Sequence, residues 1–184
     1  MKAYEMTIAG LTRALPLCPI AEDLYIGAFI IFGDVEMTVA AAGELLKKAP
    51  EFDILVTSEA KSIPLIHEMA RQCGQNEYVV ARKGPKVYME NIVTTEVDSI
   101  TTAGIQKLCI GQKEIDQMKG KRVLIVDDVI STGGSLKSIE LLVDKAGGNV
   151  VGKMAVLAEG DAADRDDIIF LEKLPLFNED GSVK

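Results

Sequence analysis

The chain has 184 residues and a formal net charge of −8, with 20 basic against 28 acidic side chains. A hydrophobic content of 48% excludes a disordered chain, and the length suits one domain, here residues 1–184. The acidic balance and the 5% of aromatic residues argue against binding to phosphate backbones or stacked bases, so we expect no nucleic-acid partner.

The three cysteines indicate the compartment. Cys18, Cys73 and Cys109 are odd in number and widely spaced, which disfavours both a disulfide framework and a structural zinc site. The early apolar run 24–33 is shorter than the roughly 20 residues that span a bilayer, and no signal-peptide pattern precedes it. We therefore predict a cytoplasmic protein with no membrane partner.

The predicted elements alternate between strands and helices along most of the chain. Residues 1–33 are apolar and irregular and suit a small subdomain. Asp34 is a candidate N-cap for a helix over 35–48. The further predicted elements are strands at 52–57, 78–81, 123–126 and 150–158, helices at about 63–73 and 135–145, a hairpin within 87–110 with its turn at 101–104, and a solvated acidic loop at 161–167. This alternation predicts an α/β fold with a parallel sheet flanked by helices.

The most informative segment begins with the buried strand 123–126. Asp127 and Asp128 follow it, and a loop with two glycines and three hydroxyl groups then leads into a helix. Glycines let successive backbone N–H groups converge on one anion, and the helix N-terminus adds positive potential. Carboxylates accept hydrogen bonds from sugar hydroxyls or bind a metal. Together these features predict a pocket for a phosphorylated sugar.

The segment 123–135 resembles the phosphoribosyl-pyrophosphate (PRPP) motif of the type I phosphoribosyltransferases. The resemblance implies that Asp127 and Asp128 bind the ribose hydroxyls. It also implies a 5′-phosphate cradle made of Ile130, Ser131, Thr132, Gly133, Gly134 and Ser135. Neither a Walker A loop nor a GxGxxG fingerprint is present, which disfavours the other common phosphate-binding folds.

Two further loops match the family in position. The residues Glu59, Ala60, Lys61 and Ser62 follow the first predicted strand, where adenine-type members carry a Glu-Ala-Arg-Gly run at the pyrophosphate loop. Lysine keeps the positive charge there and loses the bidentate geometry of arginine. The segment 82–86, which contains Arg82, Lys83 and Lys86, resembles the adenine-type Arg-Lys-x-Gly-Lys run.

The resemblance implies a type I phosphoribosyltransferase fold with a core at 35–160, a small N-terminal hood at 1–34, a mobile β-hairpin and a C-terminal extension at 161–184. The implied activity is transfer of a phosphoribosyl group from PRPP to a purine, with adenine favoured, by a homodimer. Mg²⁺ is the implied cofactor, held through PRPP, with Asp127 and Asp128 as candidate ligands. The implied catalytic residues are Asp127, Asp128 and Lys83, and the implied base-binding residues are Ile26, Phe29, Ala81 and Arg82.

Two departures from the adenine-type pattern leave alternatives open. The run 99–104 contains no carboxylate where those members carry a hairpin glutamate, and 26–32 replaces their Phe-Arg-Asp run. A xanthine, hypoxanthine or guanine phosphoribosyltransferase is one alternative. A PRPP-sensing regulator without catalysis is the other, although the short apolar N-terminal segment disfavours a DNA-binding domain.

Overall fold

A five-stranded parallel sheet forms the centre of the protein in a computed structural model. The structure describes the backbone of residues 2–99 and 104–184, and it describes the side chains of these residues except those within 97–106. The strand order is β10-β9-β8-β4-β5. Every neighbouring pair in this sheet is parallel. The strands are β4 (Ile54–Ser58), β5 (Val79–Ala81), β8 (Arg122–Ile130), β9 (Asn149–Glu159) and β10 (Ile169–Leu174). The predicted parallel α/β architecture is confirmed.

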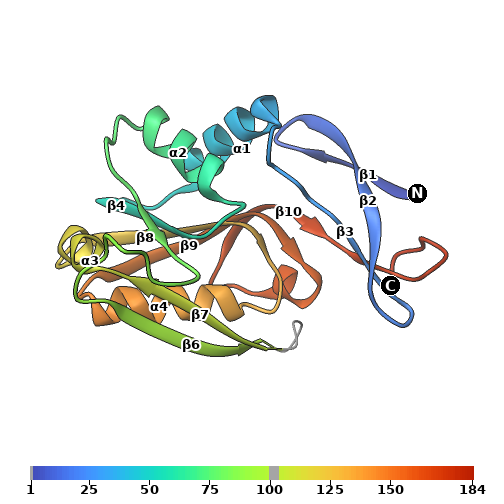
Figure 1. Ribbon diagram of the computed structural model, residues 1–184. Coiled ribbons are helices and arrows are strands. Elements are labelled where there is room, and N and C mark those ends of the chain that lie inside the picture. Colours follow the sequence, from blue (N-terminus) through green and yellow to red (C-terminus); the bar gives the residue numbers. More distant parts are fainter. Residues whose placement is uncertain (1, 100–103) are drawn as a thin grey trace.

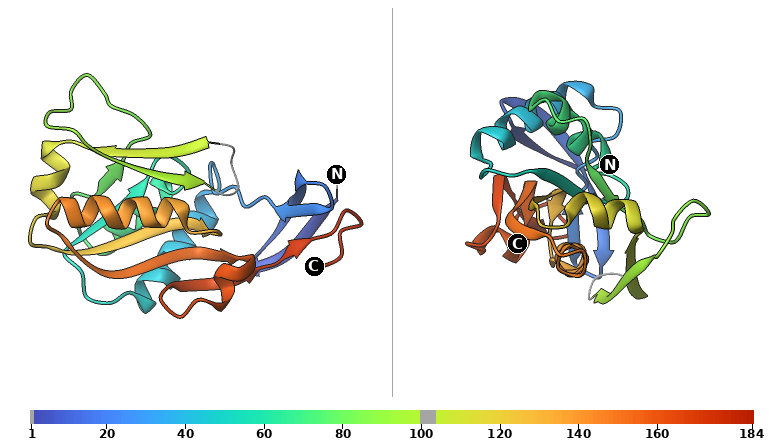
Figure 2. Two further views of the ribbon diagram at one scale, coloured as in Figure 1. Left: turned by 90° about the horizontal axis from the view of Figure 1, so that it is seen from below. Right: turned by 90° about the vertical axis from the view of Figure 1, so that its left-hand side faces the viewer.

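Helices and a hairpin cover the two faces of this sheet (Figure 1). One face carries α1 (Val35–Lys48) and α2 (Ile63–Gln72), and the other carries α3 (Gln112–Met118), α4 (Gly134–Lys145) and the hairpin of β6 (Val93–Ser99) and β7 (Gly104–Ile110). The left view of Figure 2 shows the hairpin beside α4. The α3 helix was not predicted, because it is a short polar helix with one buried residue. Residues 87–92, predicted as part of the hairpin, precede β6, and the predicted turn residues 101–103 lie outside the described residues.

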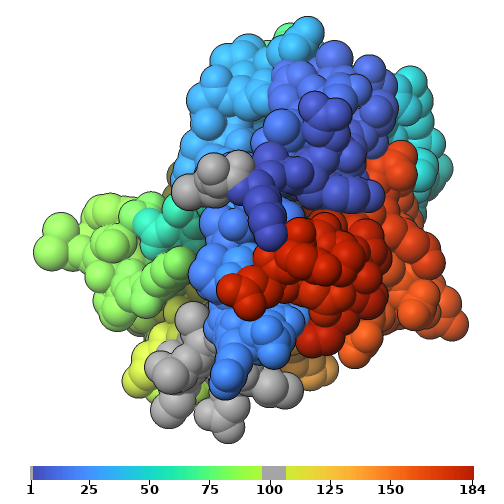
Figure 3. Space-filling model, turned by 90° about the vertical axis from the view of Figure 1, so that its right-hand side faces the viewer, coloured from blue at the N-terminus to red at the C-terminus, as the bar shows by residue number. Residues whose placement is uncertain are grey.

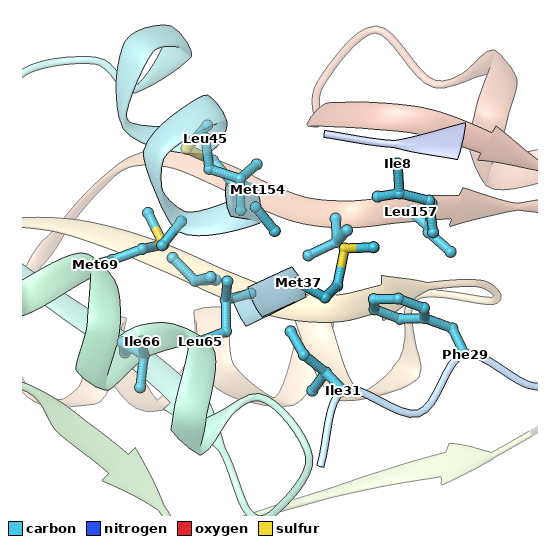
Figure 4. Packing of buried hydrophobic residues seen from close by; sticks show 14 of the residues in the cluster. Ile8, Phe29, Ile31, Met37, Leu45, Leu65, Ile66, Met69, Met154 and Leu157 are labelled. Carbon is cyan, nitrogen blue, oxygen red and sulfur yellow. The ribbon is translucent and has the colours of Figure 1, made fainter. Parts of the chain in front are cut away.

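Alternate side chains of β8 supply two separate hydrophobic clusters. Leu124 and Val126 belong to the cluster beneath α1 and α2, whereas Val123 and Ile125 belong to the cluster beneath α4. Figure 4 shows the first cluster, where side chains of α1 and α2 meet the sheet and the N-terminal segment. Because β8 is buried on both faces, its sequence is a continuous apolar run, as is typical of parallel sheets.

The N-terminal segment forms a sheet of its own, so the prediction of irregular structure was wrong. The strands β1 (Ala3–Ile8), β2 (Leu11–Ala21) and β3 (Leu24–Gly27) are antiparallel, and β11 (Leu176–Phe177) adds to the edge of β3. Pro16 pairs with Ala3, the first residue of β1, and Pro19 stands at a register shift, so both prolines occupy positions that strands tolerate. Figure 3 shows the N-terminal and C-terminal segments side by side on one face of the molecule.

The C-terminal segment takes part in both sheets. It contributes β10 to the central sheet and β11 to the N-terminal sheet. The acidic run 161–167, predicted to be a solvated loop, begins in a 3-10 helix (Gly160–Asp164) and ends in ion pairs of Asp167 with Lys153 and Arg165. Within the described residues, no helix is long and apolar enough to cross a membrane.

Candidate active site

The two adjacent aspartates lie where strands β4 and β8 separate. The β4–β8 register ends at the pair Val56–Ile125, while β8 continues to pair with β9 as far as Ile130. Asp127 and Asp128 are therefore part of β8 itself, which extends beyond the predicted end at residue 126. Loops at the carboxyl ends of parallel strands are the usual binding places of open α/β sheets.

The side chain of Ser62 contacts both aspartates. Its hydroxyl lies 2.5 Å from Oδ1 of Asp127 and 3.1 Å from Oδ1 of Asp128, and it accepts the backbone N–H of Asp128 at 2.9 Å. Ser62 is only 1% exposed. It is the N-cap residue of α2, yet its hydroxyl makes no capping hydrogen bond and contacts the aspartates. The sequence contains this serine in the predicted pyrophosphate loop, but its function was missed.

Burial dominates the electrostatics of the acidic pair. It raises the pKa of Asp127 well above the usual range of a carboxyl, and the neighbouring charge of Asp128 raises it further. Asp128 is 4% exposed, and its Oδ2 atom accepts no hydrogen bond from the described residues. Lys61 Nζ lies 3.0 Å from this oxygen, which is ion-pair distance without hydrogen-bond geometry. A sugar hydroxyl or a cation would therefore find an available acceptor here.

The glycine loop connects this pair to the start of α4. Gly133 has φ of +81° and precedes the first helical residue, Gly134. Ser131 forms a hydrogen bond with the carboxyl of Glu159 at the end of β9, and burial raises the pKa of that carboxyl. Ile130 is buried among the residues beneath α4, so of its groups only the backbone is available to a phosphate. The predicted cradle residues thus lie together at the carboxyl edge of the sheet.

Glu59 joins the predicted pyrophosphate loop to the predicted basic loop. Its backbone N–H donates to Ala81 O at 2.9 Å, and its Oε2 atom accepts the backbone N–H of Lys83 at 3.0 Å. Its Oε1 atom lies 3.2 Å from Arg82 Nη2. The hydrogen bond from Lys83, followed by the charges of Arg82 and Lys86, lowers the pKa of Glu59. The carboxylate therefore positions cations, while Lys61 and Lys83 remain exposed beside it.

The four predicted base-binding residues are not brought to one surface. Phe29 is 5% exposed and packs in the core near Met37 and Leu157 (Figure 4), and Ala81 is fully buried. Ile26 pairs with Cys18 and Leu176 within the N-terminal sheet. Arg82 is half-buried, and its Nε atom has no hydrogen-bond partner among the described residues. Phe29 is drawn into the core because α1 packs directly behind it, so its side chain offers no surface to a base.

The residues of the site fit a magnesium ion that is shared with a substrate. Among the residues that the structure describes, no group of three or more His, Cys, Asp or Glu side chains could hold a metal by itself. Mg²⁺ is commonly bound by one or two carboxylates together with substrate phosphates and water. The Oδ2 atom of Asp128, which accepts no hydrogen bond from the described residues and lies beside Asp127, suits this arrangement.

The family model described as "Phosphoribosyl transferase domain" matches residues 37–179. An adenine phosphoribosyltransferase of Bifidobacterium longum is 31% identical over 150 residues, which cover 79% of this chain and 74% of the relative. Another from Thermotoga maritima is 37% identical over 109 residues, covering 59% of each chain. The chain belongs to the phosphoribosyltransferase family, as the sequence motifs predicted.

Solved structures confirm the predicted type I phosphoribosyltransferase fold. The adenine phosphoribosyltransferase of Thermoanaerobacter pseudethanolicus superimposes with a TM-score of 0.69 at 23% identity, covering 86% of this chain and 95% of its own. That of Rhodothermus marinus gives a TM-score of 0.65 at 20% identity, covering 87% and 94%.

Proposed function

We propose that the protein transfers the 5-phosphoribosyl group of PRPP to a ring nitrogen of a purine, with adenine as the favoured base, and releases pyrophosphate in purine salvage. One observation carries this proposal. The buried pair Asp127–Asp128, the glycine loop at the start of α4 and the exposed Lys61 meet at one edge of the sheet. The names of the relatives reported above support adenine as the acceptor.

The site has suitable groups for each part of PRPP. The carboxylates of Asp127 and Asp128 accept hydrogen bonds from the ribose 2′- and 3′-hydroxyls. The backbone N–H groups and hydroxyls from Ser131 to Ser135 bind the 5′-phosphate at the start of α4. Binding of the ribose would replace the Lys61–Asp128 ion pair, which frees Lys61 for the pyrophosphate.

The chemical step forms a bond from a purine nitrogen to the anomeric carbon and breaks the bond from that carbon to the pyrophosphate oxygen. The purine loses one N–H proton, which passes to a carboxylate of the hairpin or to water. Negative charge then develops on pyrophosphate, and Lys61, Lys83 and Lys86 stabilise it. Glu59 supports this role because it holds the loop of Lys83 in place through the backbone. Mg²⁺, bound through PRPP and the aspartates, would supply charge neutralisation and a template for the leaving group.

The test is pyrophosphate release with PRPP, Mg²⁺ and a panel of adenine, hypoxanthine, guanine, xanthine, uracil and orotate. We expect adenine to give the highest kcat/KM. We also expect Asp127→Asn, Asp128→Asn and Lys83→Gln each to reduce kcat/KM by at least about tenfold while the protein stays folded. If an oxopurine gives the highest activity, that base replaces adenine as the proposed substrate. If the protein binds PRPP and turns over no base, the PRPP-sensing regulator is favoured.

We also propose a homodimer in the cytoplasm. The segment 83–92 carries three exposed apolar side chains, Val87, Tyr88 and Ile92, and such a group is typical of a contact surface. All three cysteines are free, as expected of a reducing compartment. Light scattering of the purified protein tests the dimer: we expect twice the chain mass, and replacement of Val87 and Tyr88 by serine should give the monomer mass.

A further inference from the structure

Two side chains, one at the end of β9 and one after it, lie against the glycine loop, although both lie outside the segment 123–135. Glu159, the last residue of β9, forms a hydrogen bond with Ser131. Arg165 approaches the other end of the loop: its Nη1 atom lies 2.7 Å from the position that a Cβ atom on Gly133 would occupy. The guanidinium of Arg165 therefore takes the space that any side chain at position 133 would need.

The guanidinium of Arg165 is held in a fixed orientation. Its Nε and Nη2 atoms each donate to Asp167 at 2.8 Å, one to each carboxylate oxygen. Asp167 also accepts a hydrogen bond from Lys153, which in turn pairs with Glu140 of α4 at 3.0 Å. Because this bidentate pair uses one edge of the planar guanidinium, the remaining nitrogen, Nη1, is directed toward Gly133.

A fixed cation at this point has an electrostatic role. The loop lies near the carboxyls of Asp127, Asp128 and Glu159, and the chain as a whole has a net charge of −8. A sugar phosphate bears about two negative charges at neutral pH. Backbone N–H groups and the start of α4 provide only partial positive charges, whereas the guanidinium of Arg165 carries a formal charge beside the loop.

We propose that Arg165 is an electrostatic binding residue for the 5′-phosphate, and that Asp167 is the positioning residue that directs it at the glycine loop. This inference rests on the proposed function, because it takes the loop from Ser131 to Ser135 as the phosphate cradle. It adds to that site a cation from the C-terminal segment, which the sequence motif does not contain.

The test measures binding of ribose 5-phosphate by calorimetry, without any nucleobase. Arg165→Gln removes the charge and should weaken binding by about tenfold. Arg71→Gln is the matched control, since Arg71 makes the same bidentate contact with Glu68, at 2.8 Å through each nitrogen, in the last turn of α2. We expect Arg71→Gln to change the affinity by less than about twofold. Arg165→Lys, which keeps the charge, should lose less affinity than Arg165→Gln.

A second ligand separates this role from general damage to the fold. Pyrophosphate with Mg²⁺ should bind Arg165→Gln as well as it binds the wild type, because the pyrophosphate cations come from Lys61 and Lys83. Equal losses for both ligands, or an unchanged affinity for ribose 5-phosphate, would overturn the assignment of Arg165. A wild type that binds ribose 5-phosphate and yet transfers the phosphoribosyl group of PRPP to no base would refute the proposed function and leave the Arg165 result standing.

Discussion

The hydroxyl of Ser62 lies 2.5 Å from Oδ1 of Asp127, inside the protein and just beyond the last pair of β4 and β8. Ser62 comes from the loop that follows β4, whereas Asp127 belongs to β8. The contact therefore couples the predicted pyrophosphate loop to the predicted ribose-binding pair. The Glu-Ala-Arg-Gly run on which the resemblance rests has glycine in the corresponding place, so this hydroxyl is a feature that the resemblance does not imply.

Removing that hydroxyl should destabilise the protein. Ser62→Ala leaves the buried carboxyl groups and the Asp128 N–H with fewer partners, which should lower the free energy of unfolding by about 1–3 kcal/mol. It should also raise the pKa of Asp127 further, because the Ser62 hydrogen bond lowers that pKa. Urea unfolding at pH 7 measures the first effect. Ser182→Ala is the matched control, since the Ser182 hydroxyl donates to Asp180 at 2.6 Å on the surface. Equal effects of the two substitutions would contradict a structural role for Ser62.

The raised pKa of Asp127 predicts a specific dependence of stability on pH. Since the folded state holds this proton at pH values where the unfolded state has lost it, stability falls as pH rises from about 4 toward neutrality. Asp127→Asn abolishes this titration. In urea unfolding without Mg²⁺ or PRPP, the variant should therefore become more stable relative to wild type between pH 5 and pH 7. Asp53→Asn provides the contrast, because Arg122 lowers the pKa of Asp53 to about 2, so its difference from wild type should stay constant over that range. A constant difference for Asp127→Asn as well would show that the pKa of Asp127 is not raised.

The local sequence predicted the elements that carry the motif. Runs of apolar residues bounded by Gly, Pro or charged residues marked β4, β8, β9, α2 and α4 to within a few residues. The Asp34 side chain accepts the backbone N–H of Met37 at 3.0 Å, so the N-cap of α1 is confirmed. In each case the deciding interactions are made within a few residues along the chain.

Features that depend on distant partners could not be predicted. The N-terminal sheet includes β11 from the opposite end of the chain. The sequence around residues 24–27 contains no pattern that predicts this pairing. The function of Ser62 depends on where β4 separates from β8, and the contact of Arg165 with Gly133 depends on the path of the chain after β9. The burial of Phe29, which was predicted to bind the base, could not be predicted either, because the hydrophobicity of a residue does not reveal whether it packs inward.

The hairpin contains two candidate carboxylates for proton transfer, Glu96 and Asp98, and Asp98 is the one further along β6. Lys145 in the last turn of α4 donates to Thr94 O at 3.0 Å, and the next residue of β6, Thr95, donates to Ser138 O near the start of α4 at 3.2 Å. The strand β6 therefore runs toward the start of α4 and the glycine loop. Glu96 lies 2.6 Å from Lys107 in an exposed ion pair, whereas Asp98 is further along β6 and pairs in register with Ile105.

We therefore expect Asp98→Asn to lower kcat by at least about tenfold, and Glu96→Gln to leave it within about twofold. Steady-state kinetics with saturating PRPP and base measures both. The affinity for PRPP should stay unchanged in the two variants, because neither residue belongs to the ribose-phosphate cradle. If both variants match wild type, this hairpin supplies no side-chain acid or base. If only Glu96→Gln is slow, the assignment passes to Glu96.

Adjacent glycines at the start of α4 should respond differently to alanine. Gly133 has φ of +81° and would bring its Cβ within 2.7 Å of Arg165 Nη1, whereas a Cβ on Gly134 meets nothing within 4 Å. Gly133→Ala should therefore lower the free energy of unfolding by about 1–3 kcal/mol, and Gly134→Ala should leave it unchanged or raise it by up to about 1 kcal/mol. Urea unfolding of both variants, and of Gly133→Ala combined with Arg165→Ala, separates the causes. The double variant should lose less stability than the sum of its single variants, because the clash with Arg165 is gone and only the backbone strain remains. Additive losses would mean that Arg165 does not occupy the space above Gly133 in solution.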